Sequence, residues 1–251
     1  MFTLRWTHAS AALVAALLTV TTPLPALAQA PMASSDVRQI VTFRFAAGRT
    51  GEAVAIYEQQ LKPIYLDVPP LLRFRAYRET ESPEPLDLVI VSSYSGMAGM
   101  DAANAMLRRP HSSGRSALAL YGALSAMSET HHDQFVEMEP GWSDTLVAGE
   151  RLTVFEYLRL APGAQSEFGR LLRSTVRPYE SALRLYEWSE SGRMLVSDGW
   201  DIVRIFGIGS LGDWQRYRER MREAPFAGEF DRLVSARKTI ILRQDPSLSV
   251  R

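Results

Sequence analysis

Two stretches of the chain, VRQIVTFRFAAGRTGEAVAIYEQQLKPIY (37–65) and LTVFEYLRLAPGAQSEFGRLLRSTVRPYE (152–180), align with each other without a gap at an offset of 115 residues. Farther along, LDLVIVSSYS (86–95) matches WDIVRIFGIGS (200–210) at nearly the same offset. Self-similarity at a fixed, long spacing is the sign of a duplicated structural unit. We therefore predict that the chain contains two copies of one unit.

Each copy shows the pattern strand, helix, strand, strand, helix, strand. The segment IVTFRF (40–45) alternates in character and is rich in β-branched and aromatic residues, which is typical of a strand. After the first strand of each copy, apolar residues recur at helical spacing. In the second copy these residues are Phe168, Leu171, Leu172, Val176 and Tyr179.

Pro63 and Pro178 are predicted to end the first helices, because proline lacks a backbone N–H and disfavours helical geometry in the residue before it. The first copy also has an additional apolar segment, SALALYGALSAMSETHH (116–132), which we interpret as a helix that caps a barrel mouth or contacts a partner chain. The other elements follow in the same order in both copies. We expect second strands at LLRFRAY (71–77) and RLYEW (184–188), and second helices at MDAANAMLRR (100–109) and DWQRYRERMR (213–222).

The βαββαβ order is the split βαβ, ferredoxin-like motif. Its four-stranded sheet carries helices on one face only, so the other face needs a cover, and the second copy can supply it. We therefore predict an α+β fold with two tandem ferredoxin-like units, over residues 36–140 and 150–246, that form one pseudo-symmetric α+β barrel.

In this arrangement the sequence resembles the dimeric α+β barrel superfamily in its tandem, single-chain form. VFEYLRLAPG (154–163), followed by DGWDIVRIFGIGSLGDWQRYRERM (198–221), is similar to the NIPSNAP-like branch, in which an acidic opening strand leads to a Pro-Gly corner. The first copy departs from this pattern, because Ala47 and Gly48 stand at its corner. The superfamily contains cofactor-free monooxygenases, haem enzymes, small-molecule lyases and proteins without a known activity, so the resemblance implies a fold and selects no single function.

Residues 1–28 have the order of a secretory signal peptide, with one arginine, a short apolar run and the small-residue sequence Ala26-Leu27-Ala28. Cleavage after Ala28 leaves a soluble chain that we expect in the periplasm or the medium, with no membrane contact. The chain has no cysteine, which excludes disulfides. The balance of 28 basic against 28 acidic residues argues against nucleic acid as a partner.

Period-two alternation divides each strand into a face for the helices and a face for the barrel interior. In the first strand the interior row includes Arg44, and by the repeat it includes Tyr157 and Arg159 in the second copy. In the third strand of the second copy, Val203 and Ile205 form a β-branched row, which we assign to the helix side. This assignment places Arg204 and Phe206 in the interior. We therefore predict an interior of mixed aromatic and basic character.

Arginine is permanently charged, and its planar fork matches a carboxylate or a phosphate. We predict that an anionic or aromatic small molecule binds inside the barrel. The predicted ligand-binding set is Arg44, Arg159, Arg204, Tyr186, Trp188 and Phe206. The competing interpretation is structural, because buried charge needs a partner, and strand acids such as Glu137, Glu139 or Glu187 can supply one.

Two residues are candidate proton carriers, His111 and Tyr157. His111 lies in AMLRRPHSSGR (105–115), and imidazole exchanges protons near neutral pH. At the repeat offset His111 corresponds to Phe226, so a solvated packing position is the competing interpretation.

A metal or haem centre is not expected. ETHHDQF (129–135) places two histidines beside an aspartate, but neighbours on an extended segment point apart and no second cluster completes a metal site, so we interpret this segment as a loop. The chlorite dismutase-like enzymes, tandem members of the superfamily, bind haem through a histidine in the C-terminal half. This chain has no histidine after His132, and we predict no cofactor.

The sequence therefore predicts an exported protein that binds a small anionic or aromatic molecule in the barrel, with catalysis undecided. The alternative is an enzyme of the antibiotic-biosynthesis-monooxygenase type, which oxidises or isomerises such a molecule without a cofactor. A haem-binding protein is a weaker alternative, and homo-oligomer formation is left open.

Overall fold

The computed structural model describes residues 36–81, 86–111, 114–139, 152–245 and 247–249. The predicted signal peptide over residues 1–28 lies outside this set. Among the described residues, no helix combines the length and the apolar character that a membrane crossing requires.

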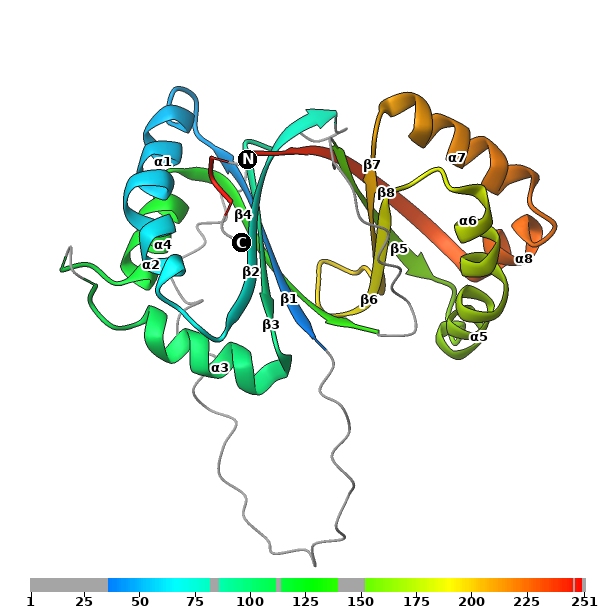
Figure 1. The fold of residues 1–251 in the computed structure, drawn as a ribbon, viewed down its shortest axis with the longest axis horizontal. Helices are drawn as coiled ribbons and strands as arrows, with labels where there is room; N and C mark the ends of the chain where they lie inside the picture. Colours follow the sequence, from blue (N-terminus) through cyan, green and yellow to red (C-terminus); the bar gives the residue numbers. More distant parts are fainter. Residues whose placement is uncertain (1–35, 82–85, 112–113, 140–151, 246, 250–251) are drawn as a thin grey trace, which may run out of the picture. The chain divides into compact units, whose positions relative to one another are not determined.

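The two halves of the chain have the same order of elements (Figure 1). The first half contains β1 (Val37–Phe45), α1 (Thr50–Ile56), the π-helical segment η1 (Tyr57–Leu61), α2 (Lys62–Leu66), β2 (Leu71–Glu81), β3 (Leu88–Tyr94), α3 (Gly96–Leu107), α4 (Ala117–Ala126) and β4 (Ser128–Met138). The second half contains β5 (Leu152–Leu160), α5 (Gln165–Leu171), the π-helical segment η3 (Leu172–Val176), α6 (Arg177–Leu183), β6 (Trp188–Val196), β7 (Ile202–Ile208), α7 (Leu211–Glu223), α8 (Ala227–Leu233) and β8 (Val234–Gln244).

The eight strands close into one antiparallel barrel in the order β1-β3-β2-β8-β5-β7-β6-β4. Within each half the spatial order is last, first, third and second strand, which is the order of a ferredoxin-like sheet. The halves join through β2 with β8 and β4 with β6, so the second strand of each half pairs with the last strand of the other. The predicted fold, two ferredoxin-like units in one pseudo-symmetric α+β barrel, is confirmed.

The repeat extends to individual contacts. A carboxylate oxygen of Asp87 accepts a hydrogen bond from the backbone N–H of Phe45 at 2.8 Å, and one of Asp201 accepts the equivalent bond from Leu160 at 2.7 Å. Each aspartate therefore ties the start of a third strand to the end of a first strand. The glycine at the corner after β1 has a φ of 79° and its counterpart after β5 has 77°, a left-handed conformation that favours glycine.

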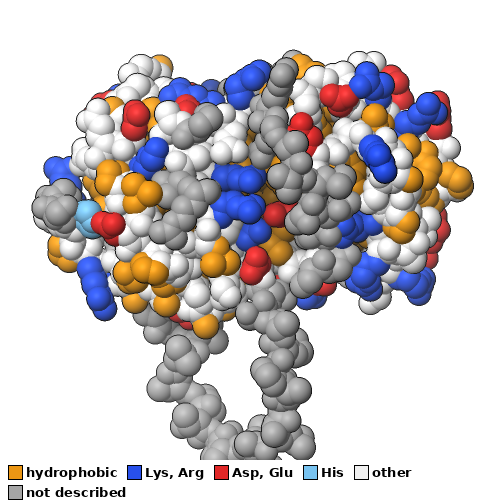
Figure 2. Space-filling model, in the orientation of Figure 1, with side chains coloured by type: hydrophobic (Ala, Val, Ile, Leu, Met, Phe, Trp, Pro, Cys, Tyr) orange, Lys and Arg blue, Asp and Glu red, His pale blue; other side chains and the backbone are white. Residues whose placement is uncertain are grey.

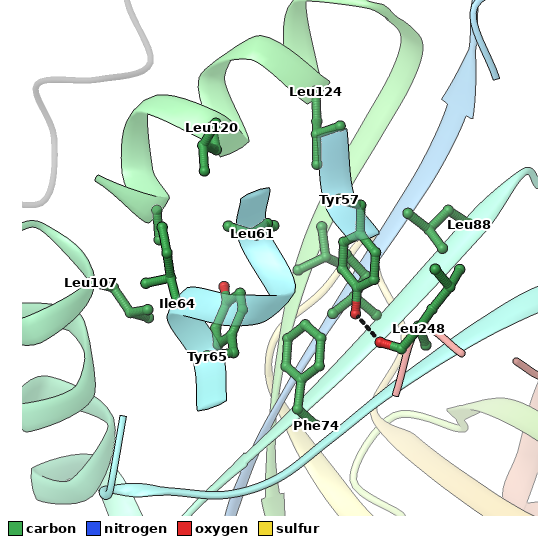
Figure 3. Close-up of a cluster of buried hydrophobic side chains, with 14 of the residues drawn as sticks. Tyr57, Leu61, Ile64, Tyr65, Phe74, Leu88, Leu107, Leu120, Leu124 and Leu248 are labelled. Atoms are coloured by element: carbon green, nitrogen blue, oxygen red, sulfur yellow. Dashed lines mark hydrogen bonds between the residues drawn. The ribbon is translucent and has the colours of Figure 1, made fainter. Parts of the chain in front are cut away.

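Apolar side chains fill both the helix layers and the barrel. The first-half helices pack on their sheet through a tyrosine-rich core (Figure 3), in which Tyr57 donates a hydrogen bond to the carbonyl of Leu248 at 2.8 Å. The second-half helices pack through two clusters that include Phe168 and Trp214. A third layer, which includes Phe155, fills the middle of the barrel.

The prediction that Pro63 and Pro178 end the first helices is wrong. Each proline lies in the first turn of an α-helix, α2 or α6, that continues directly from a π-helical segment. The N–H of the residue before each proline donates to the carbonyl five residues back, of Tyr57 or Leu172, so each proline follows a π-helical turn that has already shifted the hydrogen-bond pattern. The helical segments therefore continue to Leu66 and Leu183.

Two predicted segment boundaries are also wrong. The strand expected at 184–188 begins only at Trp188, because Arg184 ends α6 in a left-handed conformation. The segment 129–135, expected to be a loop, belongs to β4, which begins at Ser128 and pairs with β1 along its length. The first part of β4 carries polar side chains on both faces, so it shows no alternation of apolar and polar residues that would identify a strand.

The helix predicted to be additional in the first half has a counterpart, α8, in the second half, and it does not cap the barrel. It is α4, and it buries Leu120 and Leu124 in the first-half core, on the outer face of the sheet (Figure 3). The alternative that this helix contacts a partner chain stays a prediction.

The predicted strand faces are correct for β1 and β5 and wrong for β3 and β7. Val203 and Ile205 belong to the barrel interior, whereas Arg204 and Phe206 lie on the helix side. All seven residues of β7 are buried, so both of its faces are shielded and alternation carries no signal. The register decides the face, because Phe206 pairs with the helix-facing Val154, and residues directly opposite share a face.

Candidate functional site

A cavity of about 480 Å³ opens at the end of the barrel where β1 and β5 finish. Both halves of the chain contribute to it, and its volume is in the range of small-molecule sites. We call this cavity the mouth site and define it by Arg44, Tyr157, Arg159, Asp198, Trp200 and Lys238.

Positive charge exceeds negative charge in the mouth site. Arg44, Arg159 and Lys238 line the cavity against one carboxylate, Asp198. Arg44 and Arg159 occupy equivalent positions on β1 and β5, so the duplication itself brings two guanidinium groups to the same barrel end. Figure 2 shows one face of the molecule, on which Lys and Arg side chains lie among acidic and apolar ones. A cationic, partly enclosed cavity attracts anions.

Arg159 is held in place by its neighbours. Its Nε donates a hydrogen bond to the carbonyl of Gly199 at 2.7 Å, and its guanidinium lies 5.2 Å from the ring centre of Trp200. Arg44 instead pairs with Glu129 at 3.1 Å, and both side chains are about half exposed, so water screens this ion pair. Arg159 is therefore the better ordered of the two cations.

Aromatic side chains form the apolar wall of the mouth site. The rings of Tyr157 and Trp200 lie 6.1 Å apart. Burial, with a smaller contribution from the charge of Asp198, raises the pKa of Tyr157 well above its usual value. The phenol therefore keeps its proton near neutral pH, and the predicted proton carrier Tyr157 is suited to donate a hydrogen bond and unsuited to act as a base.

His132 and Asp198 form a polar pair in the mouth site. His132 extends from β4, and its Nδ1 lies 3.0 Å from a carboxylate oxygen of Asp198. Both side chains are at least about half exposed, so water screens this pair as well. The carboxylate contacts one imidazole nitrogen, which leaves the other nitrogen to exchange a proton with a ligand. This pair spans the two halves of the chain.

Gln134 supplies an unpaired polar atom in the same wall. Its side chain is 7% exposed, and its Oε1 has no hydrogen-bond partner among the described residues. Buried polar atoms are nearly always hydrogen-bonded. A ligand or a water molecule that donates a hydrogen bond would satisfy this acceptor.

Sequence reasoning found part of this site. Arg44, Tyr157 and Arg159 come together as predicted from the faces of β1 and β5. His132 and Gln134 were missed, although they alternate along β4 and could have been found once that segment was recognised as a strand. Asp198, Trp200 and Lys238 were also missed.

Trp188 lies at the opposite end of the barrel. Its ring lies 5.2 Å below the guanidinium of Arg75, and it borders a space of about 20 Å³ with Arg38 and Glu190. Such a space holds little more than one water molecule. Arg38 precedes Arg44 by six residues on β1, which separates the two ends by about 20 Å. Trp188 therefore does not belong to the mouth site.

Arg204, Phe206 and Tyr186 lie on the helix side of the second-half sheet. Arg204 is 2% exposed and borders a second cavity of about 330 Å³ between the sheet and helices α7 and α8, which we call the helix–sheet cavity. The ring of Tyr186 lies 5.8 Å from that of Phe206. The barrel-interior location predicted for Arg204 and Phe206 is therefore wrong, and Tyr186 precedes β6 and lies in the same helix-side cluster.

The expected partners of the arginines also differ from the prediction. Arg204 pairs with Glu156 and Glu180. Glu137 and Glu139, predicted to neutralise interior arginines, both pair with Arg193 of β6, at 2.8 and 2.6 Å.

His111 is remote from the mouth site. Its Nε2 lies 2.8 Å from the carboxylate of Asp67, the residue that follows α2 in the helix layer of the first half. The two predicted proton carriers, His111 and Tyr157, are therefore not brought together.

The donor groups at the helix–sheet cavity do not fit a haem centre. The second half has no histidine, and Tyr217 at the helix–sheet cavity donates a hydrogen bond to Glu180 while burial raises its pKa well above the usual value. Haem ligation by tyrosine needs a phenolate. Among the described residues no group of three or more acidic or histidine side chains could hold a metal ion. The helix–sheet cavity therefore offers neither a histidine nor a phenolate as a haem ligand.

No family model and no curated protein matches the sequence. Solved structures do match it. A putative monooxygenase from Lactobacillus acidophilus NCFM has a TM-score of 0.57 at 10% identity, over 84% of this chain and 94% of that chain. An anthrone oxidase-like protein has a TM-score of 0.55 at 12% identity, over 84% and 92%.

A chlorite dismutase variant from Candidatus Nitrospira defluvii, in complex with cyanide, has a TM-score of 0.60 at 11% identity, over 86% of this chain and 93% of that chain. At this level of identity the likeness shows the fold alone. The chain is therefore similar in fold to structures described as a putative monooxygenase, an anthrone oxidase-like protein and a chlorite dismutase.

Proposed function

We propose that the protein binds a small organic anion with an aromatic body in the mouth site, outside the cytoplasm. The observation that supports this most strongly is a cavity with aromatic walls, lined by Arg44, Arg159 and Lys238 and by the carboxylate of Asp198. Glu129 pairs with Arg44, so Arg159 and Lys238 are the main candidates to bind the anion. The unpaired Oε1 of Gln134 supports a ligand that also carries a hydrogen-bond donor. The N-terminal sequence supports export, and VFEYLRLAPG (154–163) supports kinship with the NIPSNAP-like branch.

Calorimetric titration with 2-naphthoate tests this binding. We expect saturable binding that weakens about tenfold or more in Arg159→Met and in Lys238→Met, because each loses a charge-assisted hydrogen bond of about 1.5–3 kcal/mol. Arg216→Met is the matched control, since Arg216 is exposed on α7 and pairs with Asp213. Equal affinity in Arg159→Met, Lys238→Met and the control would contradict the proposal.

The second candidate function is oxidation of the bound molecule by O₂ without a cofactor. His132, paired with Asp198, favours it, because a base in the mouth site could remove a proton from an acidic carbon next to a carbonyl. The carbanion then transfers electrons to O₂, in the balanced reaction R₂CH₂ + O₂ → R₂C=O + H₂O. Arg159 and Lys238 would stabilise the oxygen that becomes anionic. The names of two similar structures, a putative monooxygenase and an anthrone oxidase-like protein, support this class of reaction.

Oxygen uptake with anthrone as the probe tests this candidate. We expect a rate that falls about 100-fold in His132→Gln, the usual contribution of a general base. His111→Gln is the control and keeps the wild-type rate, because His111 lies in the helix layer. Uptake no faster than in buffer would restrict the function to binding.

A further inference from the structure

The second-half helix layer contains a buried ionic network. Arg204 donates a hydrogen bond to Glu156 at 3.2 Å and a second one to Glu180, and the phenol of Tyr217 also donates to Glu180. Glu180 is 1% exposed and comes from α6, whereas Glu156 and Arg204 are register partners on β5 and β7. Four charged or polar groups therefore meet where helices and sheet normally make an apolar core.

The first half provides an internal comparison for this network. At the repeat offsets, Glu156, Glu180 and Arg204 correspond to Val41, Tyr65 and Ile90. All three counterparts are buried in the first-half core, where Figure 3 shows Tyr65 packed beside Phe74. The same fold is therefore built at these positions without any charge.

Stability does not explain the charged set. Replacing a buried ion network by apolar residues of similar volume is often neutral or stabilising, because the charges lose their hydration. Arg204 also retains a buried Nε that has no hydrogen-bond partner among the described residues. An incompletely satisfied network in place of an available apolar core points to a role in binding.

The helix–sheet cavity gives that role a location. It is about 330 Å³ in volume, and Glu156, Arg204 and Tyr217 form its polar side. Met221 and Phe230 form part of its apolar side. Such a pairing of a few buried polar groups with apolar walls is typical of a small-molecule site.

The charges indicate the class of ligand. Two carboxylates already face the single guanidinium of Arg204, so the buried side of the cavity has no spare positive charge for an anion. Arg218, Arg222 and the ion pair of Arg237 with Asp231 also line the cavity, but all four side chains are exposed, so water and salt screen them. A neutral molecule is favoured, with a hydroxyl or carbonyl oxygen for Arg204 and an aromatic body for the apolar wall.

We propose that the helix–sheet cavity is a second small-molecule site, which binds a neutral hydroxylated or keto aromatic compound against the Arg204–Glu180–Tyr217 network. This site is independent of the mouth site, and it belongs to the second half of the chain. The probe pair 2-naphthol and 2-naphthoate separates the two sites, because the molecules share a ring system and differ in charge.

Calorimetric titration of 2-naphthol into two variants tests the proposal. Met221→Trp fills the cavity from α7, and we expect it to weaken 2-naphthol binding at least tenfold. Met97→Trp is the matched control, since Met97 is half exposed on α3, the counterpart of α7, and we expect wild-type affinity. The triple variant Glu156→Val, Glu180→Tyr, Arg204→Ile installs the first-half residues, and we expect a folded protein that has also lost 2-naphthol binding.

Wild-type affinity for 2-naphthol in Met221→Trp, or no saturable 2-naphthol binding by the wild type, would overturn this proposal. Met221→Trp decides the matter if the triple variant does not fold. Binding of 2-naphthoate is expected to stay unchanged in Met221→Trp and to weaken in Arg159→Met. The two proposals can therefore be contradicted separately, the mouth site by the 2-naphthoate titrations and the helix–sheet cavity by the 2-naphthol titrations.

Discussion

At the scale of single residues, comparison of the two halves separates repeated from unrepeated side chains, and both kinds occur in the two sites, since Arg44 and Arg159 are a repeated pair in the mouth site. Asp87 and Asp201 make the same bond to the end of a first strand, at 2.8 and 2.7 Å. Arg204 differs from its apolar counterpart and takes part in a buried network. The duplicated chain therefore contains its own control for each position.

The first prediction concerns Asp201. Its replacement by alanine leaves the backbone N–H of Leu160 without its acceptor, so we expect the free energy of unfolding to fall by about 1–3 kcal/mol. Urea unfolding followed by circular dichroism measures this loss. Asp101→Ala, at an exposed position of α3, is the control and should change the stability by less than about 0.5 kcal/mol. A loss in Asp201→Ala no larger than in the control would show that the repeated bond contributes little.

At the scale of elements, the sequence predicted the inward and outward faces of a strand only where those two faces differ in polarity. β1 and β5 carry an apolar row and a row with arginines, so their faces and the location of Arg44 and Arg159 followed from the sequence. β7 is buried on both faces, so the same reasoning assigned its helix face and its interior face the wrong way round. The location of Arg204 needed the register between β5 and β7, which is a tertiary property that a local pattern does not contain.

The second prediction concerns the junction of β4 and β6, where the two halves join. A Cβ at Gly192 would lie 2.5 Å from Val136 Cγ1 and 2.7 Å from the backbone oxygen of Glu137. We expect Gly192→Ala to destabilise the protein by about 1–3 kcal/mol, because the strands must move apart.

Gly122→Ala is the matched control, since a Cβ there meets nothing within 4 Å and Gly122 lies inside α4. This change should stabilise the protein by up to about 1 kcal/mol, because alanine favours the helix. Thermal unfolding of both variants compares them directly. Equal melting temperatures for the two would contradict the tight packing inferred at Gly192.

At the scale of the whole molecule, the two halves complete one another. Each sheet leaves one face open, and the barrel closes only when β2 pairs with β8 and β4 with β6. The sequence could predict this closure from the repeat. It could not predict that Asp198 and Trp200 border the barrel end. Both lie in the stretch 198–221 that carries the family resemblance, but they precede β7, so no strand alternation assigns their side chains to a face.

The third prediction concerns alkaline pH. Burial is the first cause that raises the pKa of six tyrosines, and for Tyr94 the pKa reaches about 12. The other five are Tyr57, Tyr65, Tyr121, Tyr157 and Tyr217. Above about pH 10 the unfolded chain loses phenol protons that the folded protein keeps, so rising pH favours unfolding.

We therefore expect the free energy of unfolding to be fully retained below about pH 10 and to fall between about pH 10 and 12, by up to about 1.4 kcal/mol per pH unit for each tyrosine. Urea unfolding at a series of pH values gives this slope. Phenolate absorbance of the folded protein should lag behind that of the unfolded chain. A free energy of unfolding that stays constant up to about pH 11 would contradict the burial of these phenols.

The mouth site as an anion-binding site is the central claim, and a crystal structure of the protein grown with 2-naphthoate tests it most directly. We predict electron density for the ligand in the mouth site, with its carboxylate within hydrogen-bond distance of Arg159 and Lys238 and its rings against Tyr157 and Trp200. An empty mouth site at a saturating ligand concentration, or 2-naphthoate bound only elsewhere, would contradict the claim.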